Sequence, residues 1–292
     1  MDAPIDAKTI QIFLPTGEPR GIRIAEITTR IVQAIAIPRS DLAKAKHRPE
    51  MQHVALYFLF GESDAAARPS VYIGQTEDLV GRLGNHDQKK EFWQTAVLIV
   101  SKTHSFTQAH IRFLEWHCIQ MAKEADRYNV ENGNGGSKPH VTEPMEADLR
   151  DAFQTLSVLV GTLGFPVFEP ISRSAAASQD FFLRGKDAEA VGELVEDGFV
   201  VRAGSLGRND IVPSAIDQVT SIRQPLFESG VIVHETSRLR FSRDHLFRTP
   251  SGAAMAVLGR SANGWMEWKN TAGETLHESR RVQDPDISTR DD

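Results

Sequence analysis

The stretch His53-Val54-Ala55-Leu56-Tyr57-Phe58-Leu59-Phe60-Gly61 is an apolar run with the length of one strand, and Ser70-Val71-Tyr72-Ile73-Gly74 follows it closely. A run of this length bounded by turn-forming residues predicts a strand that is buried on both faces. The second run is close enough to pair with the first as a hairpin. Residues 92–101 form a third apolar run. The sequence therefore predicts a small three-stranded antiparallel sheet in an α+β protein.

Helices are expected on either side of these strands. Thr76 is a plausible N-cap for a short helix that follows the second strand. A longer helix is predicted from Thr107, because apolar residues then recur at steps of three and four. Thr142 and Pro144 predict the start of another helix, which Gly164 ends. The three strands are thus expected to be flanked by helices.

Shifts in composition divide the chain into parts. Residues 1–50 predict an N-terminal extension made of a β-hairpin and a short helix, ahead of a central domain at residues 51–170. Small polar residues at 171–180 predict a linker. Short predicted strands and helices at residues 181–280 indicate a second small α+β domain, and the charged residues 281–292 predict a frayed tail.

Composition limits the classes of function. The 292 residues carry a formal charge of −6 and a single cysteine, Cys118, which excludes an intramolecular disulfide framework. We find no charged and apolar leader and no apolar run near the roughly 20 residues that span a bilayer. We therefore expect a cytoplasmic protein with no membrane contact.

Charge is unevenly distributed. Residues 1–150 hold 18 Lys and Arg against 19 Asp and Glu, whereas residues 151–292 hold 15 against 20. The overall charge argues against a protein that coats nucleic acid without specificity. A local cluster in the first half predicts either a phosphate-facing patch or an ordinary solvated surface. Its members are Arg20, Arg23, Arg30, Arg39, Lys44, Lys46 and Arg48.

Two of the three tyrosines, Tyr57 and Tyr72, lie in the two strands that are expected to pair. If the strands are neighbours, both phenol groups can converge on one surface. A buried tyrosine is more often a core residue with a satisfied hydroxyl group, and that alternative stays open for each of them.

Three further side chains follow the two tyrosines. Arg82 and His86 are four residues apart and project from the same face of the predicted helix. A guanidinium suits a phosphate, and an imidazole can accept or relay a proton near neutral pH. Glu115 lies at the flank of an apolar helix stripe, where a carboxylate must be paired, protonated or bound to a metal. A salt bridge with Arg82 or Arg112 is the alternative for Glu115.

These elements, in this order, resemble the GIY-YIG nuclease family. The resemblance covers residues 53–134 and rests on Ala55-Leu56-Tyr57, Tyr72-Ile73-Gly74, Arg82 with His86, Glu115 and a later asparagine. Two features depart from the family pattern. Ala55-Leu56 stands where the family has Gly-Ile, and the segment between the tyrosine strands is longer than usual. The resemblance implies that residues 51–170 form a GIY-YIG-like nuclease domain.

The resemblance also implies roles for these residues. Tyr57 would activate the attacking water, with Tyr72 or His86 assisting by hydrogen bonding or proton relay. Arg82 would hold the scissile phosphate. Glu115 would bind one divalent cation, Mg²⁺ in the first place and Mn²⁺ as the alternative. The family's later asparagine aligns with Asn132, and Asn129 competes for the same role.

The second half resembles an uncharacterised domain that often follows GIY-YIG modules, and its end is similar to small domains attached to DNA modification and restriction enzymes. The stretch that carries this similarity runs from Ser251 to Lys269. Within it, an exposed Trp265 or Trp268 near Arg260 and Lys269 could stack on a base. The alternative is that both tryptophans pack in a small core.

Together these observations predict a metal-dependent endonuclease that hydrolyses DNA phosphodiester bonds. The second domain would select the DNA substrate or a protein partner. The alternative, from another class, is a catalytically inactive nucleic-acid-binding or regulatory protein that retains the fold. An adaptor that binds proteins through its acidic second half is the third hypothesis.

Overall fold

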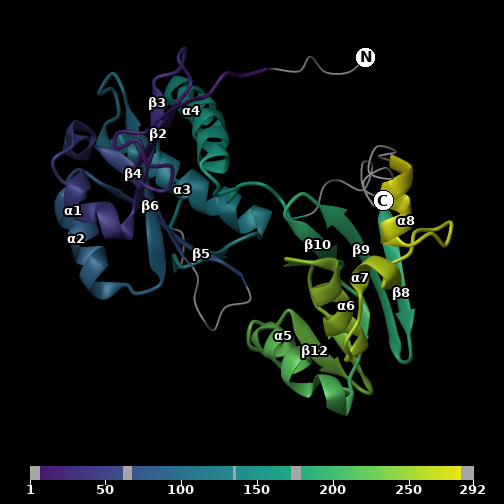
Figure 1. Cartoon of the computed structure of the whole chain (residues 1–292). Coiled ribbons are helices and arrows are strands. Elements are labelled where there is room, and N and C mark those ends of the chain that lie inside the picture. The colour runs from purple at the N-terminus through teal and green to yellow at the C-terminus, as the bar shows by residue number, and fades with distance from the viewer. Residues whose placement is uncertain (1–6, 62–67, 134–135, 172–178, 284–292) are drawn as a thin grey trace. The chain divides into compact units, whose positions relative to one another are not determined.

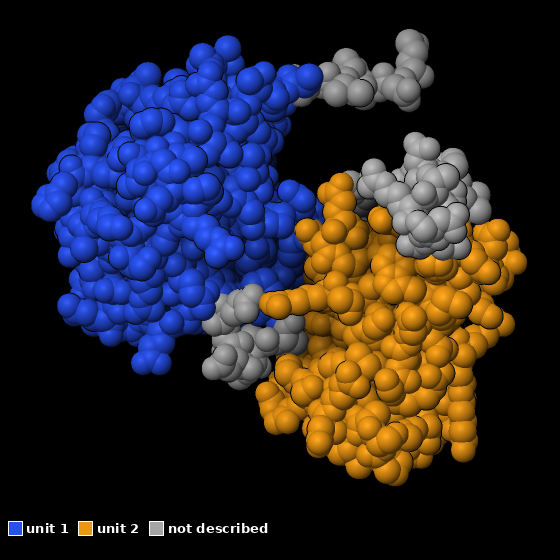
Figure 2. Space-filling view, in the orientation of Figure 1, with its two compact units in different colours: residues 1–64, 68–170 blue, residues 65–67, 171–292 orange. Residues whose placement is uncertain are grey.

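A computed structural model describes residues 7–61, 68–133, 136–171 and 179–283. The chain forms two compact units, one within residues 1–170 and the other within residues 171–292 (Figure 2). The expected linker and the expected tail lie largely outside the described residues. No described helix is both long enough and apolar enough to cross a membrane. The α+β class predicted from the sequence is confirmed, and each unit contains its own sheet.

The first unit is built on a seven-stranded sheet. In spatial order its strands are β1 (Gln11–Phe13), β2 (Arg23–Glu26), β3 (Val32–Pro38), β6 (Trp93–Ser101), β4 (Ala55–Gly61), β5 (Ser70–Thr76) and β7 (Asn129–Val130). The three predicted strands β6, β4 and β5 are adjacent and antiparallel. The sheet is larger than the three strands predicted because β3 pairs with β6 from Val32 to Pro38 and leads on to β2 and β1. Residues 1–50 thus contribute strands to this sheet.

Helices cover both faces of this sheet (Figure 1). They are α1 (Leu42–Ala45), α2 (Leu79–Lys89), α3 (Gln108–Ala125) and α4 (Glu143–Thr162), with 3-10 turns at Arg39–Asp41 and Pro49–Gln52. Alternate residues of β4 enter two separate cores. Leu56 and Phe58 pack with the α3 and α4 side, whereas Tyr57 and Leu59 pack with the α1 and α2 side. The strand register therefore directs Tyr57 toward α2.

The helix that follows β5 begins slightly later than its sequence suggested. Asp78, and not Thr76, is the N-cap of α2, because its carboxylate accepts the backbone N–H of Gly81 at 2.9 Å. The Thr76 hydroxyl accepts the Asp78 N–H at 3.0 Å and so supports the cap. This start fixes the rotation of α2 and hence the direction of the side chains on its sheet-facing side.

The second unit has a separate seven-stranded sheet. Its path is β12 (Ile232–Glu235), β13 (Arg238–Phe241), β11 (Leu206–Arg208), β9 (Ala188–Val195), β10 (Gly198–Val201) and β14 (His245–Phe247), with β8 (Asp180–Gly185) also paired to β9. Its helices are α5 (Ile216–Glu228), α6 (Pro250–Leu258), α7 (Gly264–Glu267) and α8 (Leu276–Gln283), and a 3-10 turn spans Pro213–Ala215. The apolar helix α6 is almost wholly buried in the core of this unit. The second unit therefore has a core of its own.

Candidate active site in the first unit

Tyr57 lies at the centre of a polar cluster on the α2 side of the first sheet. It faces Gly74 across the β4–β5 pair. A Cβ atom at position 74 would lie 2.4 Å from the Tyr57 hydroxyl oxygen, so glycine leaves the room that this ring needs. No part of Tyr57 is exposed. The phenol of β4 is thus held in a closed space beneath β5.

Helix α2 brings two nitrogen atoms to the same hydroxyl group. Arg82 Nε donates to the Tyr57 oxygen at 2.9 Å, and His86 Nε2 lies 2.9 Å from that oxygen. Because a guanidinium can only donate, the hydroxyl proton of Tyr57 is free to point at the imidazole. The geometry therefore allows two hydrogen bonds in series, in which Arg82 donates to Tyr57 and Tyr57 donates to His86.

Burial sets the protonation of Tyr57 and His86. Desolvation raises the pKa of the Tyr57 phenol well above its ordinary value, although the hydrogen bond from Arg82 opposes the rise. Desolvation, together with the Arg82 and Lys90 charges, lowers the pKa of His86 to about 4. Both groups are therefore neutral near pH 7, which lets the phenol donate and the imidazole accept.

Tyr72 is the more accessible of the two tyrosines. Its side chain is half-buried, and its ring centroid lies 6.3 Å from that of Tyr57 and 5.2 Å from that of His86. Arg82, which is exposed, also interacts with the Tyr72 hydroxyl. A ligand can therefore approach Tyr72 and Arg82, while Tyr57 lies behind them.

Glu115 on α3 completes the cluster from another direction. Among the described residues its half-buried side chain forms no ion pair within 4 Å, so the predicted salt bridge with Arg82 or Arg112 is not formed. Burial raises the pKa of the Glu115 carboxyl, and the Arg82 charge, the Gln75 backbone N–H and the Arg112 charge oppose the rise. The carboxyl group thus lies near β5, where it accepts the Gln75 backbone N–H, with positive charge close by but no ion-pair partner among the described residues.

Asn132 holds the strand that carries Tyr72. Its side-chain oxygen accepts the Ile73 N–H at 2.9 Å, and its side-chain nitrogen donates to the Ile73 carbonyl at 2.7 Å. These two bonds continue the parallel β5–β7 ladder, in which Val71 pairs with Val130. Asn132 therefore supports the site through the Ile73 backbone, and among the described residues its side chain makes no hydrogen bond to Tyr57, Tyr72 or Glu115.

Asn129, the competing asparagine, lies at the start of β7. Its side-chain nitrogen donates to the Glu131 carboxylate at 2.7 Å and to the Ser70 hydroxyl at 3.4 Å. Ser70 is the first residue of β5, four residues before Gly74. Of the two asparagines, Asn132 is the one that binds the Tyr72-Ile73-Gly74 segment.

The donor set fits a hard cation held by few protein ligands. Within the described ranges no group of three or more His, Cys, Asp or Glu side chains is arranged to hold a metal ion. Mg²⁺ commonly keeps several waters and binds through one or two carboxylates together with substrate phosphates. The half-buried Glu115 carboxyl, which has no ion-pair partner among the described residues, is the side chain of the cluster that could hold a cation in that mode.

Lys90 belongs to the site although its sequence context did not single it out. Its Nζ lies 4.4 Å from the centroid of the Tyr72 ring. The available signal was its position, because Lys90 directly follows the helix that carries Arg82 and His86.

The basic residues of positions 20–48 behave mainly as an ordinary surface. Several are bound to carboxylates: Arg30 to Asp151 at 2.6 Å, Arg39 to Asp87 at 2.7 Å, Lys44 to Asp41 at 2.7 Å and Arg48 to Glu50 at 2.8 Å. Charges that are neutralised in this way offer little attraction to phosphate. The solvated-surface interpretation of this cluster is therefore favoured.

In the second unit both tryptophans pack against the core. Trp268 is fully buried and Trp265 is partly buried against the same cluster. The Arg260 guanidinium is bound to Glu267 at 2.7 Å. The interpretation of these tryptophans as core residues is favoured over base stacking.

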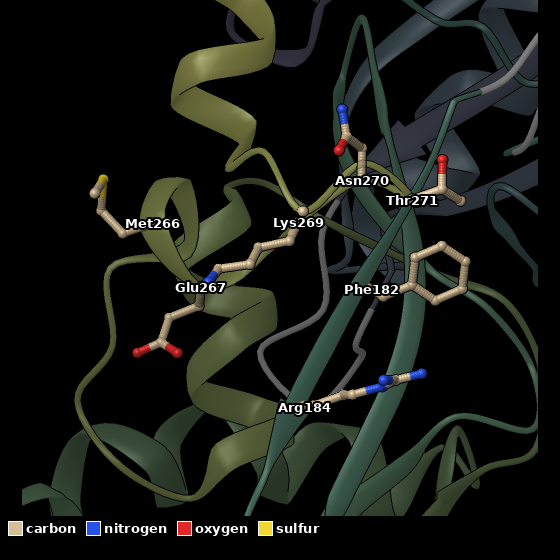
Figure 3. A pocket seen from close by; sticks show the side chains of 8 residues that line it. Phe182, Arg184, Met266, Glu267, Lys269, Asn270 and Thr271 are labelled. Carbon is tan, nitrogen blue, oxygen red and sulfur yellow. The ribbon is translucent and has the colours of Figure 1, made fainter.

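A hollow of about 770 Å³ lies beside β8 in this unit (Figure 3). Phe182 and Arg184 line it from β8, and Lys269 lines it from the segment after α7. Phe182 and Lys269 also exchange backbone hydrogen bonds, which join that segment to the edge of β8. Two cationic side chains and one aromatic ring thus share this hollow.

Comparisons with known proteins bear on the second unit. Residues 181–280 match the family described as Domain of unknown function (DUF4357). This match agrees with the expected uncharacterised C-terminal domain, whereas no match to a GIY-YIG family model was found. No curated protein matches the chain, and no solved structure does.

Proposed function

We propose that this chain is a metal-dependent endonuclease that hydrolyses DNA phosphodiester bonds in its first unit. One observation carries the proposal: the Tyr57 hydroxyl lies 2.9 Å from both Arg82 Nε and His86 Nε2, in the position that the GIY-YIG resemblance assigns to the active site. The accessible Tyr72 ring and the unpaired Glu115 carboxyl lie beside this arrangement.

Protons would move along the Tyr57–His86 pair. A phenol with an ordinary pKa near 10 is a weak base at neutral pH, so it needs a group that takes its proton. His86 is neutral and is placed to accept it. The Tyr57 oxygen can then accept a proton from the attacking water while it passes its own proton to His86 Nε2.

Arg82 would connect this proton relay to the substrate. Its guanidinium is exposed on one side and bound to Tyr57 on the other. Transfer of the guanidinium to a phosphate would neutralise charge in the transition state and uncover the Tyr57 hydroxyl for water. Tyr72 would orient the phosphate or the water, since its hydroxyl interacts with the same guanidinium.

Glu115 would hold the cation, with Mg²⁺ preferred and Mn²⁺ as the alternative. When bound there, the cation would polarise the phosphate and help to generate the nucleophile. The Gln75 N–H and the flanking arginines keep the carboxyl oriented toward β5. Cys118 is the single cysteine of the chain and so has no intrachain disulfide partner, which supports a reducing, cytoplasmic compartment in this proposal.

The second unit would select the DNA substrate or a protein partner. Its support is limited to the hollow beside β8, which Lys269 and Phe182 both line. A cation and an aromatic ring together suit a phosphate with an adjacent base. Arg184 and the Glu267 carboxylate line the same hollow, and Arg184 pairs with Glu189 at 3.7 Å.

Plasmid nicking by the purified full chain tests the proposal. We expect cleavage that requires Mg²⁺ or Mn²⁺ and that Glu115→Gln abolishes. The matched control is Glu124→Gln, which removes an exposed carboxylate from the same helix and should leave cleavage unchanged. Equal nicking by the wild type and Glu115→Gln would refute the active-site assignment. Parallel reactions on RNA show which nucleic acid is the substrate.

A non-cleaving nucleic-acid-binding protein is the second candidate. The complete burial of Tyr57 favours it, because water cannot reach the hydroxyl in this arrangement. In that case the wild type would bind DNA with the same affinity as Glu115→Gln, and neither protein would nick it at any metal concentration.

A further inference from the structure

Three side chains, two on α2 and one on the residue that follows it, lie along the two tyrosines. Arg82 and His86 are four residues apart on α2, and Lys90 is the C-cap residue, with an extended backbone, directly after the last helical residue, Lys89. The first two contact Tyr57, and Lys90 lies over the ring of Tyr72. Positive charge therefore borders the candidate active site at Arg82 on α2 and again at Lys90, just after the helix ends.

Lys90 is held by aromatic rings and not by a carboxylate. Its Nζ lies 4.4 Å from the Tyr72 ring centroid and 5.9 Å from that of Phe92. Among the described residues it forms no ion pair within 4 Å. Ring contacts fix the position of an ammonium without neutralising it. The Lys90 charge is thus ordered, half-buried and available to an anion.

Arg82 and Lys90 approach Tyr72 at different places. Arg82 interacts with the hydroxyl end, whereas Lys90 lies over the ring face. A phosphate bound by Arg82 at the hydroxyl would leave the Lys90 ammonium beside the next part of the ligand. A polynucleotide supplies a further phosphate there, and an isolated phosphodiester does not.

We propose that Lys90 is a substrate-positioning residue that binds a backbone phosphate next to the one held by Arg82, so that the substrate is a polynucleotide strand lying over Tyr72. This inference rests on the proposed function for the identity of the phosphate at Arg82. It adds that the site engages at least two consecutive phosphates. Simple phosphodiesters would then lack the Lys90 contact.

Binding of a short DNA duplex by the full chain tests the proposal without cleavage. In a Glu115→Gln background, Lys90→Met keeps the aliphatic stem on the rings but removes the charge, and Lys90→Arg restores it. We expect Lys90→Met to raise Kd by roughly 5- to 10-fold. It should also reduce the slope of log affinity against log salt concentration by about one. Lys90→Arg should recover most of the affinity.

Lys89→Met is the matched control, because Lys89 is the exposed last residue of α2 and directly precedes Lys90. It removes the same charge and should change Kd by less than about 2-fold. Equal effects of Lys89→Met and Lys90→Met, no effect of either, or no measurable binding would overturn the role of Lys90.

Kinetics provide a second readout that a merely structural role would not produce. Lys90→Met should raise KM for DNA by a larger factor than it changes kcat, and should lower kcat/KM more for DNA than for bis(p-nitrophenyl) phosphate. Equal losses on both substrates would overturn the proposal. If the wild type cleaves neither substrate, the nuclease proposal fails by itself, and the binding measurement still decides the role of Lys90.

Discussion

Arg82 in the first unit and Arg223 in the second both project from helices, but their partners differ in kind. Arg82 is exposed and donates to the hydroxyl of a titratable side chain, Tyr57. Arg223 is only 2% exposed. It donates to three backbone carbonyl oxygens, those of Ala256 at 2.9 Å, Asn209 at 3.2 Å and Arg208 at 2.7 Å.

The difference shows how the partners of a charge indicate its role. Burial lowers the pKa of Arg223 to about 10, so it remains a cation at neutral pH whose donors are used by the backbone. It ties α5 to the end of α6 and to the segment after β11. Arg82 has a partner that can exchange protons and a side open to solvent, which favours chemistry over support.

The largest effect is expected at Arg82. Arg82→Ala should lower the rate of plasmid cleavage by roughly 10²- to 10³-fold, equivalent to about 3 to 4 kcal/mol, because a donor to the scissile phosphate is lost. The unfolding free energy should change by less than about 1 kcal/mol. Arg20→Ala, at an exposed position, is the control for charge. If Arg82→Ala lost enough unfolding free energy to explain its lower activity, Arg82 would have a structural role like that of Arg223. The contrast between the two arginines would then be wrong.

The next effect is expected at Arg223 and concerns stability. Arg223→Met should lower the unfolding free energy of the second unit by about 3 kcal/mol, because buried carbonyls lose charged donors. Chemical denaturation followed by the fluorescence of the second-unit tryptophans measures this loss. Arg240→Met, which removes a surface ion pair with Glu235 at 3.2 Å, should cost less than about 1 kcal/mol. Equal losses of unfolding free energy for Arg223→Met and Arg240→Met would show that the backbone hydrogen bonds of Arg223 contribute little to stability.

A smaller effect is expected at Asn132. Asn132→Ala should destabilise the first unit by about 1 to 2 kcal/mol, since the Ile73 N–H and carbonyl both lose a partner. Thermal unfolding compares it with Asn129→Ala, whose bonds to Glu131 and Ser70 lie nearer to solvent. A larger loss of cleavage than of stability for Asn132→Ala would move this residue from support into the chemistry of the site.

The smallest effect is a pH dependence from His86. Its folded pKa of about 4 lies below the ordinary value near 6.5, so the unfolded chain binds more protons between these values. The stability that His86 provides is therefore complete above about pH 6.5 and is lost as the pH falls toward 4, by on the order of 1 kcal/mol. Unfolding measured against pH should show this loss for the wild type and not for His86→Gln.

The control for this pH dependence is His47→Gln at an exposed position, which should keep the wild-type profile. An unchanged profile for His86→Gln would mean that the imidazole titrates normally and does not accept the Tyr57 proton.

Local patterns were enough to predict the centre of the first sheet. The apolar runs that contain Tyr57 and Tyr72 became β4 and β5, and the periodic residues after Thr107 became α3. The size of the sheet was not predictable, because the pairing of β3 with β6 joins residues far apart in the chain. In the second unit, β9 has little strand signal of its own, since Ala188–Val195 is rich in Ala and Glu, which are weak strand formers.

The composition of the candidate site followed from the order of its residues, but its geometry did not. No sequence rule indicated that Tyr57 would be enclosed while Tyr72 stayed accessible, because enclosure depends on the contact with Gly74 and on the rotation of α2. The bonds from Asn132 to the Ile73 backbone also required the structure, since they depend on where the chain returns after α3.

Gly74 has a consequence for diverged relatives of this protein. A methyl group at this position would lie 2.5 Å from the ring carbon Cζ of Tyr57 as well as 2.4 Å from its oxygen. Phenylalanine at position 57 would thus demand the glycine as strictly as tyrosine does. A glycine retained at position 74 would indicate that the space below it still holds an aromatic ring. Only the residue at position 57 would show whether the hydroxyl group is also retained.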